Sequence, residues 1–113
     1  MTALKLYPAS VIKEIDRQYS QDYGISSFQL MKLAARRVVE VILARYSDSK
    51  RAQVFCGSGN NAGDGFLIAA GLADRGWLVQ VALVGDTEKL SGASREALAV
   101  CQNSQAIVQR FEG

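Results

Sequence analysis

The chain has 113 residues, of which 49% are hydrophobic, with 13 basic and 11 acidic side chains and no histidine. This length suits one small domain, and the hydrophobic share is too high for a disordered protein. The lack of histidine excludes serine–histidine triads and histidine-ligated metals within this chain. A net charge of +2 gives no case for a nucleic acid or a membrane as partner.

The two cysteines, Cys56 and Cys101, are too few for a disulfide scaffold or a four-thiolate zinc site. We expect both to be reduced and buried. The first eight residues lack the apolar segment of a secretory signal. The apolar runs are also far shorter than the roughly 20 residues that span a bilayer. We therefore expect a soluble, cytoplasmic protein.

Residues 1–50 are predicted to form two helices. Ser10 can cap the first, in which apolar side chains recur at helical spacing from Ile12 to Tyr23. The second begins with Ser26, which together with Gln29 fits the S-x-x-Q capping box. Its core-facing stripe is expected to consist of Leu30, Ala34, Val38, Val41 and Ile42.

The pattern changes after residue 50 to alternating strands and helices. We expect strands at 52–56, at 78–84 and from 106, joined by helices that end before Gly76 and begin near Ser91. The order ααβαβαβ indicates parallel strands with right-handed crossovers. Residues 1–113 would thus be one partial domain, with two leading helices at 1–50 and a βαβαβ nucleotide-binding half at 51–113. Because three strands leave unpaired edges, we expect a longer domain or a partner chain to complete the sheet.

One segment carries chemistry, from Cys56 to Gly65: Cys-Gly-Ser-Gly-Asn-Asn-Ala-Gly-Asp-Gly. It follows a predicted strand, at the edge where open α/β sheets bind ligands, and the next helix offers free N–H groups to a phosphate. Its glycines, with Ala62, match the dinucleotide fingerprint G-x-G-x-x-G/A, and Asp86 could then reach a ribose. On the glycines alone, a purely steric turn explains the pattern equally well.

Asn60, Asn61 and Asp64 place polar side chains in and beside this turn. Amide oxygens and a carboxylate suit a hard cation or a polar ligand. The alternative is local: an asparagine in the left-handed conformation, and Asp64 capping the helix. Both interpretations can hold together.

Residues 56–65 resemble the GxGNNGGDG signature of NAD(P)H-hydrate epimerases, the YjeF N-terminal domain family. Residues 25–40 and 65–86 resemble the neighbouring parts of that domain, so the likeness covers nearly the whole chain. The implied fold is a three-layer, Rossmann-like α/β domain with a parallel sheet and two N-terminal helices, here truncated. The departures from the family pattern are Ala62, where glycine is common, and Lys32, Leu33 and Ala35, where Glu, Asn and Gly are frequent.

The family interconverts the R and S epimers at C6 of hydrated NADH or NADPH, a metabolite repair that lets a stereospecific dehydratase restore the cofactor. The resemblance implies K⁺ and the NAD(P)H hydrate as ligands, and an ADP- or ATP-dependent dehydratase, fused or separate, as a partner. It assigns substrate contact to Asn60, Asn61, Ala62, Gly63 and Asp64, a phosphate loop to Gly57, Ser58 and Gly59, and K⁺ to Asn61. It assigns no catalytic residue, since the family's general acid/base aspartate is expected beyond Gly113.

The resemblance therefore implies binding by this chain rather than a complete catalytic site, and a partial domain that is inactive or weakly active alone. One alternative is a non-enzymatic binding or dimerisation module, because the domain also resembles those of an mRNA-decapping scaffold and an apolipoprotein-binding protein. Another is a fragment of an NAD(P)-binding Rossmann oxidoreductase. We further expect self-association, as a homodimer or through the uncovered edge of the third strand.

Overall fold

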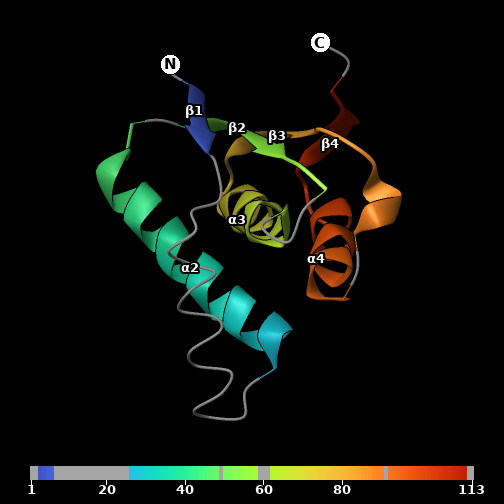
Figure 1. The fold of residues 1–113 in the computed structure, drawn as a ribbon. Helices are drawn as coiled ribbons and strands as arrows, with labels where there is room; N and C mark the ends of the chain where they lie inside the picture. Colours follow the sequence, from blue (N-terminus) through green and yellow to red (C-terminus); the bar gives the residue numbers. More distant parts are fainter. Residues whose placement is uncertain (1–2, 7–25, 49, 59–61, 91, 112–113) are drawn as a thin grey trace.

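The computed structural model describes residues 3–6, 26–48, 50–58, 62–90 and 92–111 (Figure 1). Four strands of this described part form one sheet: β1 (Ala3–Leu6), β2 (Arg51–Cys56), β3 (Leu78–Leu83) and β4 (Ile107–Arg110). The described α-helices that lie against it are α2 (Ser27–Arg45), α3 (Ala62–Asp74) and α4 (Gly92–Gln102). A short 3₁₀ turn, η1 (Thr87–Lys89), lies between β3 and α4. The expected α/β, Rossmann-like arrangement is confirmed.

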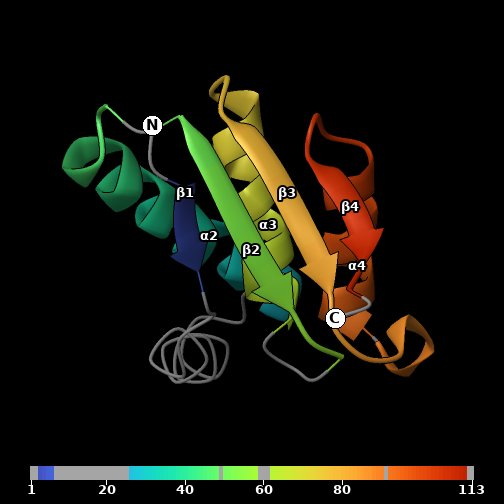
Figure 2. The same ribbon diagram turned by 90° about the horizontal axis from the view of Figure 1, so that it is seen from above.

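The four strands are parallel and lie in the order β1-β2-β3-β4 (Figure 2). Each strand therefore lies next to the strand that precedes it in the sequence, and always on the same side of it. Since crossovers between parallel strands are right-handed, successive additions in one direction place all the connecting helices on one face. Figure 1 shows this, with α2, α3 and α4 together beneath the sheet. In the part of the chain that the structure describes, no helix covers the opposite face.

The strand β1 is an element that the sequence analysis did not predict. It pairs with β2 from Ala3 opposite Arg51 to Leu6 opposite Val54, which makes β2 an interior strand. Four residues are too few for a convincing alternation of apolar and polar side chains, and the strand is defined by its pairing with β2. The first predicted helix, at 10–24, lies outside the described residues.

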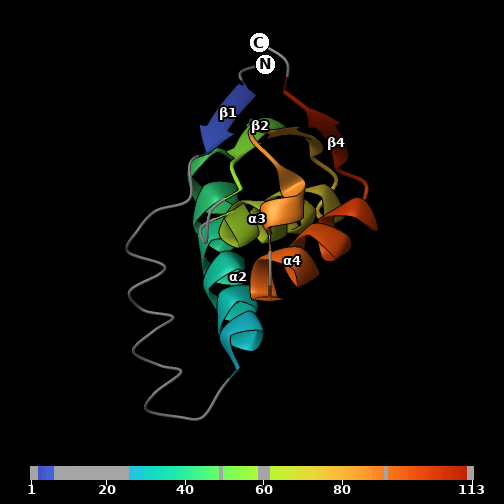
Figure 3. The same cartoon turned by 45° about the vertical axis from the view of Figure 1, so that its right-hand side comes forward.

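The helix α3 forms the centre of the core, between the sheet on one side and α2 and α4 on the other (Figure 3). All its residues except Gly71 and Asp74 are buried, and Phe66 and Leu72 are fully so. The sequence of this helix is rich in alanine and glycine, so the neighbouring helices can approach closely. A Cβ atom on Gly71 would lie 2.8 Å from Val39 Cγ2 of α2.

The buried stripe of α2 differs from the prediction. Its buried residues are Leu30, Met31, Ala35, Val39 and Ile42, whereas Ala34 and Val38 are half-buried and Val41 is 55% exposed. The two stripes are neighbours on a helix that is apolar on more than one side, so spacing alone does not choose between them. The glycines of α3 determine which face of α2 is buried, because Gly63 and Gly71 leave room for the side chains of Met31 and Val39.

The ends of two helices follow the predicted chemistry. Ser26 is the N-cap of α2, and its Oγ accepts the N–H of Gln29 at 3.2 Å. After α3, Gly76 has a φ of +88°, and its N–H donates to the carbonyl of Ala73. The N–H of Trp77 donates to the carbonyl of Leu72. These two bonds form a Schellman motif, which ends the helix and turns the chain into β3.

Candidate functional site

The candidate site lies at the carboxyl ends of β2 and β3, where each strand runs into a glycine-containing loop (Figure 2). The N–H of Val84 donates to the carbonyl of Cys56 at 2.8 Å, which holds the two strand ends together. Gly85 has a φ of +104°, and a Cβ atom there would lie 3.1 Å from Ser58 Oγ. The loops that follow the two strands are therefore in contact, and a side chain at Gly85 would disturb Ser58.

The predicted phosphate-loop and substrate residues fall on either side of a gap in the described chain. Gly57 is exposed and Ser58 half-buried at the end of β2. Gly59, Asn60 and Asn61 lie outside the described residues. Gly57 and Ser58 directly follow β2, and α3 begins at Ala62, so the described residues have the order of strand, loop and helix that the sequence analysis expected.

Ala62, Gly63 and Asp64 form the first turn of α3, and all three are buried. Asp64 is 4% exposed, and its carboxylate lies in the first turn, where the helix dipole favours a negative charge. In this position the three residues can present backbone N–H groups toward the loop, since the first N–H groups of a helix have no partner within the helix.

The first turn of α3 is packed against both neighbouring helices. A Cβ atom on Gly63 would lie 2.7 Å from Met31 Sδ of α2 and 3.2 Å from Ser94 Cα of α4. Met31 and Ser94 are themselves buried. The sequence analysis did not connect either residue with the motif, and no local signal does so, because they come from helices distant along the chain.

Asp86 has a local role at this edge of the sheet. It is the N-cap of η1, and its Oδ1 accepts the N–H of Glu88 at 2.9 Å. The guanidinium of Arg95 on α4 braces the same turn: Nη2 donates to the carbonyl of Leu90 at 2.9 Å and to that of Glu88 at 3.3 Å. These bonds fix the chain after β3, and they account for Asp86 without a ribose ligand.

The two cysteines are free and buried, as expected. Burial, with a smaller contribution from the charge of Cys101, raises the pKa of Cys56 to about 12. Burial likewise raises the pKa of Cys101 to about 11, against a hydrogen bond from Ser104 that lowers it. Both thiols are therefore protonated at neutral pH, and the protonated form is the less nucleophilic one. Within the described ranges, no group of three or more His, Cys, Asp or Glu side chains could hold a metal ion.

A hollow of about 260 Å³ lies on the helical side, beside the C-terminal half of α3. Val39 and Leu67 contribute to its apolar lining. Its charged lining residues are the basic Lys32, Arg36 and Arg75 and the acidic Asp74. It lies away from the loops at the strand ends.

Of the described helices, none is both long enough and apolar enough to cross a membrane.

Comparison with known proteins gives a family match over most of the chain. The model of the family described as YjeF-related protein N-terminus matches residues 27–112. Among curated proteins, a bifunctional NAD(P)H-hydrate repair enzyme of Coxiella burnetii is 34% identical over 106 residues, which are 94% of this chain and 22% of that protein. An NAD(P)H-hydrate epimerase of Caenorhabditis briggsae is 36% identical over 100 residues, covering 88% of this chain and 41% of the relative.

A third relative, an NAD(P)H-hydrate epimerase of Rhodobacter capsulatus, is 38% identical over 91 residues, or 74% of this chain and 43% of its own length. The chain thus spans about two fifths of these epimerases and about one fifth of the bifunctional enzyme.

Proposed function

We propose a function from one premise: the chain belongs to the YjeF-related N-terminal family. We infer that it is the nucleotide-binding part of an NAD(P)H-hydrate epimerase domain, acting in the repair of hydrated NADH and NADPH. The observation that carries this proposal is the position of the 56–65 segment. It runs from the end of β2 into the first turn of α3, within the stretch that the family model matches. The epimerase names of the relatives support the substrate class.

The nucleotide phosphates are proposed to lie against the loop between β2 and α3. Gly57, Ser58 and Gly59 would wrap the phosphate, and the N–H groups at the start of α3 would face its charge. The exposure of Gly57 supports this, because among the described residues a Cβ atom there would meet only the Val84 carbonyl, at 3.8 Å. The backbone at Gly57 is therefore open to approach in the described structure.

Asn60 and Asn61 are proposed to contact the hydrated nicotinamide nucleotide with their side chains. The burial of Ala62, Gly63 and Asp64 favours backbone contacts from those three residues. The carboxylate of Asp64 is proposed to stabilise the start of the helix rather than to transfer a proton to a substrate, which its position in the first turn of α3 supports. By the family resemblance, the aspartate that moves the C6 proton belongs to the part of the domain that this chain does not span.

Potassium is proposed as a ligand of Asn61, on the family resemblance. A K⁺ ion needs several oxygen ligands, as carbonyl rings show in potassium channels. Among the residues that the structure describes, no group of three or more His, Cys, Asp or Glu side chains could hold a metal ion, so backbone carbonyl or further amide oxygens would have to join Asn61 around the ion.

Binding of the hydrated nucleotide tests the proposal. NADPH hydrate added to the chain should raise its Tm, and more in potassium than in sodium buffer, because a ligand that binds only the folded state stabilises it. Asn61→Ala should abolish the potassium dependence, while Asn103→Ala, an exposed asparagine at the end of α4, should not. No shift in either buffer would refute the proposal. An equal shift with NAD⁺ would favour an NAD(P)-binding oxidoreductase fragment instead.

Two partners belong to the proposal. A dehydratase acting on the epimerised hydrate is one, and the bifunctional names of several relatives support it. The other is a second copy of this chain, because the exposed apolar side chains Leu78, Val84, Ile107 and Phe111 lie on or beside the sheet face that no described helix covers. Sedimentation from micromolar to millimolar concentration tests this pairing, and a monomer throughout would refute it.

A further inference from the structure

Gly63, in the first turn of α3, is closely surrounded by atoms of the two neighbouring helices. The atoms around its missing Cβ are Met31 Sδ at 2.7 Å, Met31 Cε at 2.9 Å and Ser94 Cα at 3.2 Å. Distances below about 3 Å are too short for carbon atoms in contact, whose optimal separation is about 3.5–4.0 Å. Any side chain at position 63 must therefore displace a neighbour, and the neighbours belong to α2 and α4.

The two neighbours differ in how easily they can move. Ser94 contributes a backbone atom of α4, which is fixed within its helix. Met31 contributes the end of a flexible side chain, which is 7% exposed and packed in the core. The thioether of Met31 is therefore the adjustable part of this contact, and it occupies the space beside Gly63 in the first turn of α3.

The same pair of helices has a second contact of the same kind. A Cβ atom on Gly71 would lie 2.8 Å from Val39 Cγ2. Gly71 and Val39 follow Gly63 and Met31 by eight residues in their respective helices, so the contact lies about two turns further from the loop. The chain thus contains a matched internal control, with the same type of contact, the same helix pair and a position remote from the candidate site.

We propose that Met31 is a positioning residue for the nucleotide loop, and that Gly63 is a glycine because the Met31 thioether occupies the space of its side chain. This rests on the function proposed above, in which the N–H groups at the start of α3 face the ligand phosphate. Phosphate recognition by a helix N-terminus depends on where those N–H groups lie, and misplacements of about 1 Å are costly at such sites. Met31 acts through the backbone of α3 and does not touch the ligand.

Six variants test the proposal: Gly63→Ala, Met31→Ala and their combination, with Gly71→Ala, Val39→Ala and their combination as controls. Each is measured for its Tm without ligand and for its affinity for NADPH hydrate by calorimetry. Gly63→Ala should lower the Tm and weaken binding about tenfold, which corresponds to about 1.4 kcal/mol. Adding Met31→Ala should restore much of the affinity. Gly71→Ala should lower the Tm similarly and leave the affinity within about twofold.

Two outcomes would overturn the proposal. If Gly71→Ala weakens binding as much as Gly63→Ala, the effect is general destabilisation. If Met31→Ala fails to improve the affinity of Gly63→Ala, the glycine is required by something other than the thioether. Met31→Leu, which keeps an apolar side chain of similar volume, should bind the hydrate nearly as well as the original chain.

If the chain binds no hydrate, the proposed function is refuted. The role of Met31 can then be tested by a second measurement that needs no ligand. Amide hydrogen exchange of residues 62–66 reports the stability of the first turn of α3 directly. Met31→Ala should speed exchange there more than Val39→Ala does, because Met31, unlike Val39, contacts Gly63 in this turn. Equal exchange in the two variants would show that Met31 does not position the turn.

Discussion

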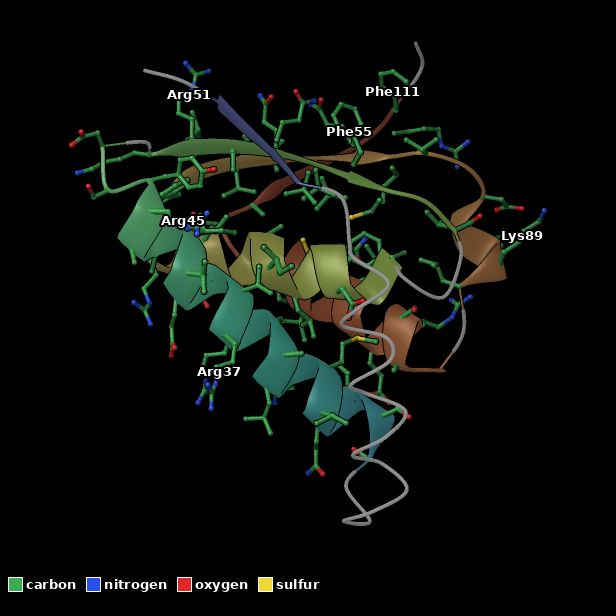
Figure 4. All side chains as sticks on the ribbon, turned by 60° about the vertical axis from the view of Figure 1, so that its left-hand side comes forward. Arg37, Arg45, Arg51, Phe55, Lys89 and Phe111 are labelled. Atoms are coloured by element: carbon green, nitrogen blue, oxygen red, sulfur yellow. The ribbon has the colours of Figure 1, made fainter. Side chains whose placement is uncertain are left out.

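Two phenylalanine side chains, one on each side of the sheet, allow a test of whether the face that no described helix covers is exposed to solvent. Phe66 on α3 is fully buried on the helical side, whereas Phe111 is 50% exposed on the other (Figure 4). Phe111 packs edge-to-face on Phe55, with ring centroids 5.8 Å apart. The same substitution, phenylalanine to alanine, should therefore have very different costs at positions 66 and 111.

At Phe66 the loss of buried area and the cavity left behind should cost about 4 kcal/mol. A domain of this size is stable by roughly 6–17 kcal/mol, so Phe66→Ala should remain folded at 25 °C. With an unfolding entropy near 2.1 cal/mol/K per residue, each kcal/mol lowers the Tm by about 4 °C, so Phe66→Ala should lower it by about 16 °C. Phe111→Ala loses about half a buried ring and one aromatic contact, roughly 1–2 kcal/mol, or about 4–8 °C.

Urea unfolding followed by circular dichroism, at several protein concentrations, measures both costs. The m-value should stay constant in both variants, so that the midpoint reports stability alone. If Phe111→Ala costs as much as Phe66→Ala at every concentration, the reasoning is wrong, because the face must then be covered within the chain itself. A cost that grows with concentration would instead show a second copy lying on Phe111.

Further predictions concern single positions. Gly76→Ala should cost about 1–2 kcal/mol through backbone strain, because φ is +88° and no atom of the described residues lies within 4 Å of the added Cβ. Gly57→Ala should cost less than half as much, and equal losses of Tm would contradict this. Burial raises the pKa of Cys56 to about 12 and of Cys101 to about 11, so the stability that these thiols contribute is complete below pH 9 and is lost as the pH rises through 11 and 12. Cys56→Ala should make the alkaline fall in Tm shallower, and an unchanged slope would count against it. Ser26→Ala should cost about 1 kcal/mol by removing the cap of α2, and an unchanged Tm would mean that the cap contributes nothing.

The elements after residue 50 could be predicted because local chemistry marks their ends. Gly76 requires a positive φ after α3, and the apolar run of residues 78–83 is typical of a strand in a parallel sheet. The strand β1 could not be predicted, since four residues acquire strand geometry only by pairing with β2. The face of α2 that is buried could not be chosen either. That choice depends on the glycines of α3, such as Gly71, which sequence periodicity does not relate to α2.

In the candidate site, too, some features could be predicted from the sequence and others could not. The position of the loop at a strand end follows from the order of strand, glycine-rich turn and helix, and the structure agrees for Gly57 and Ser58. The burial of Asp64 and the contact between Gly63 and Met31 could not be inferred. They arise where three helices meet, and the partners are separated by an entire strand and loop. A polar residue near a loop suggests ligand contact, but the sequence alone does not show whether its side chain is buried or exposed.

The sequential order of the strands has a consequence for how the protein is made. Each of the four described strands lies beside the one translated just before it, so no later strand has to be inserted into a pair that has already formed. When Leu83 has left the ribosome, α3 already has β2, β3 and α2 as neighbours, and most of its apolar surface can be covered. The nascent chain can therefore fold in step with its synthesis, with each new unit added to a finished edge.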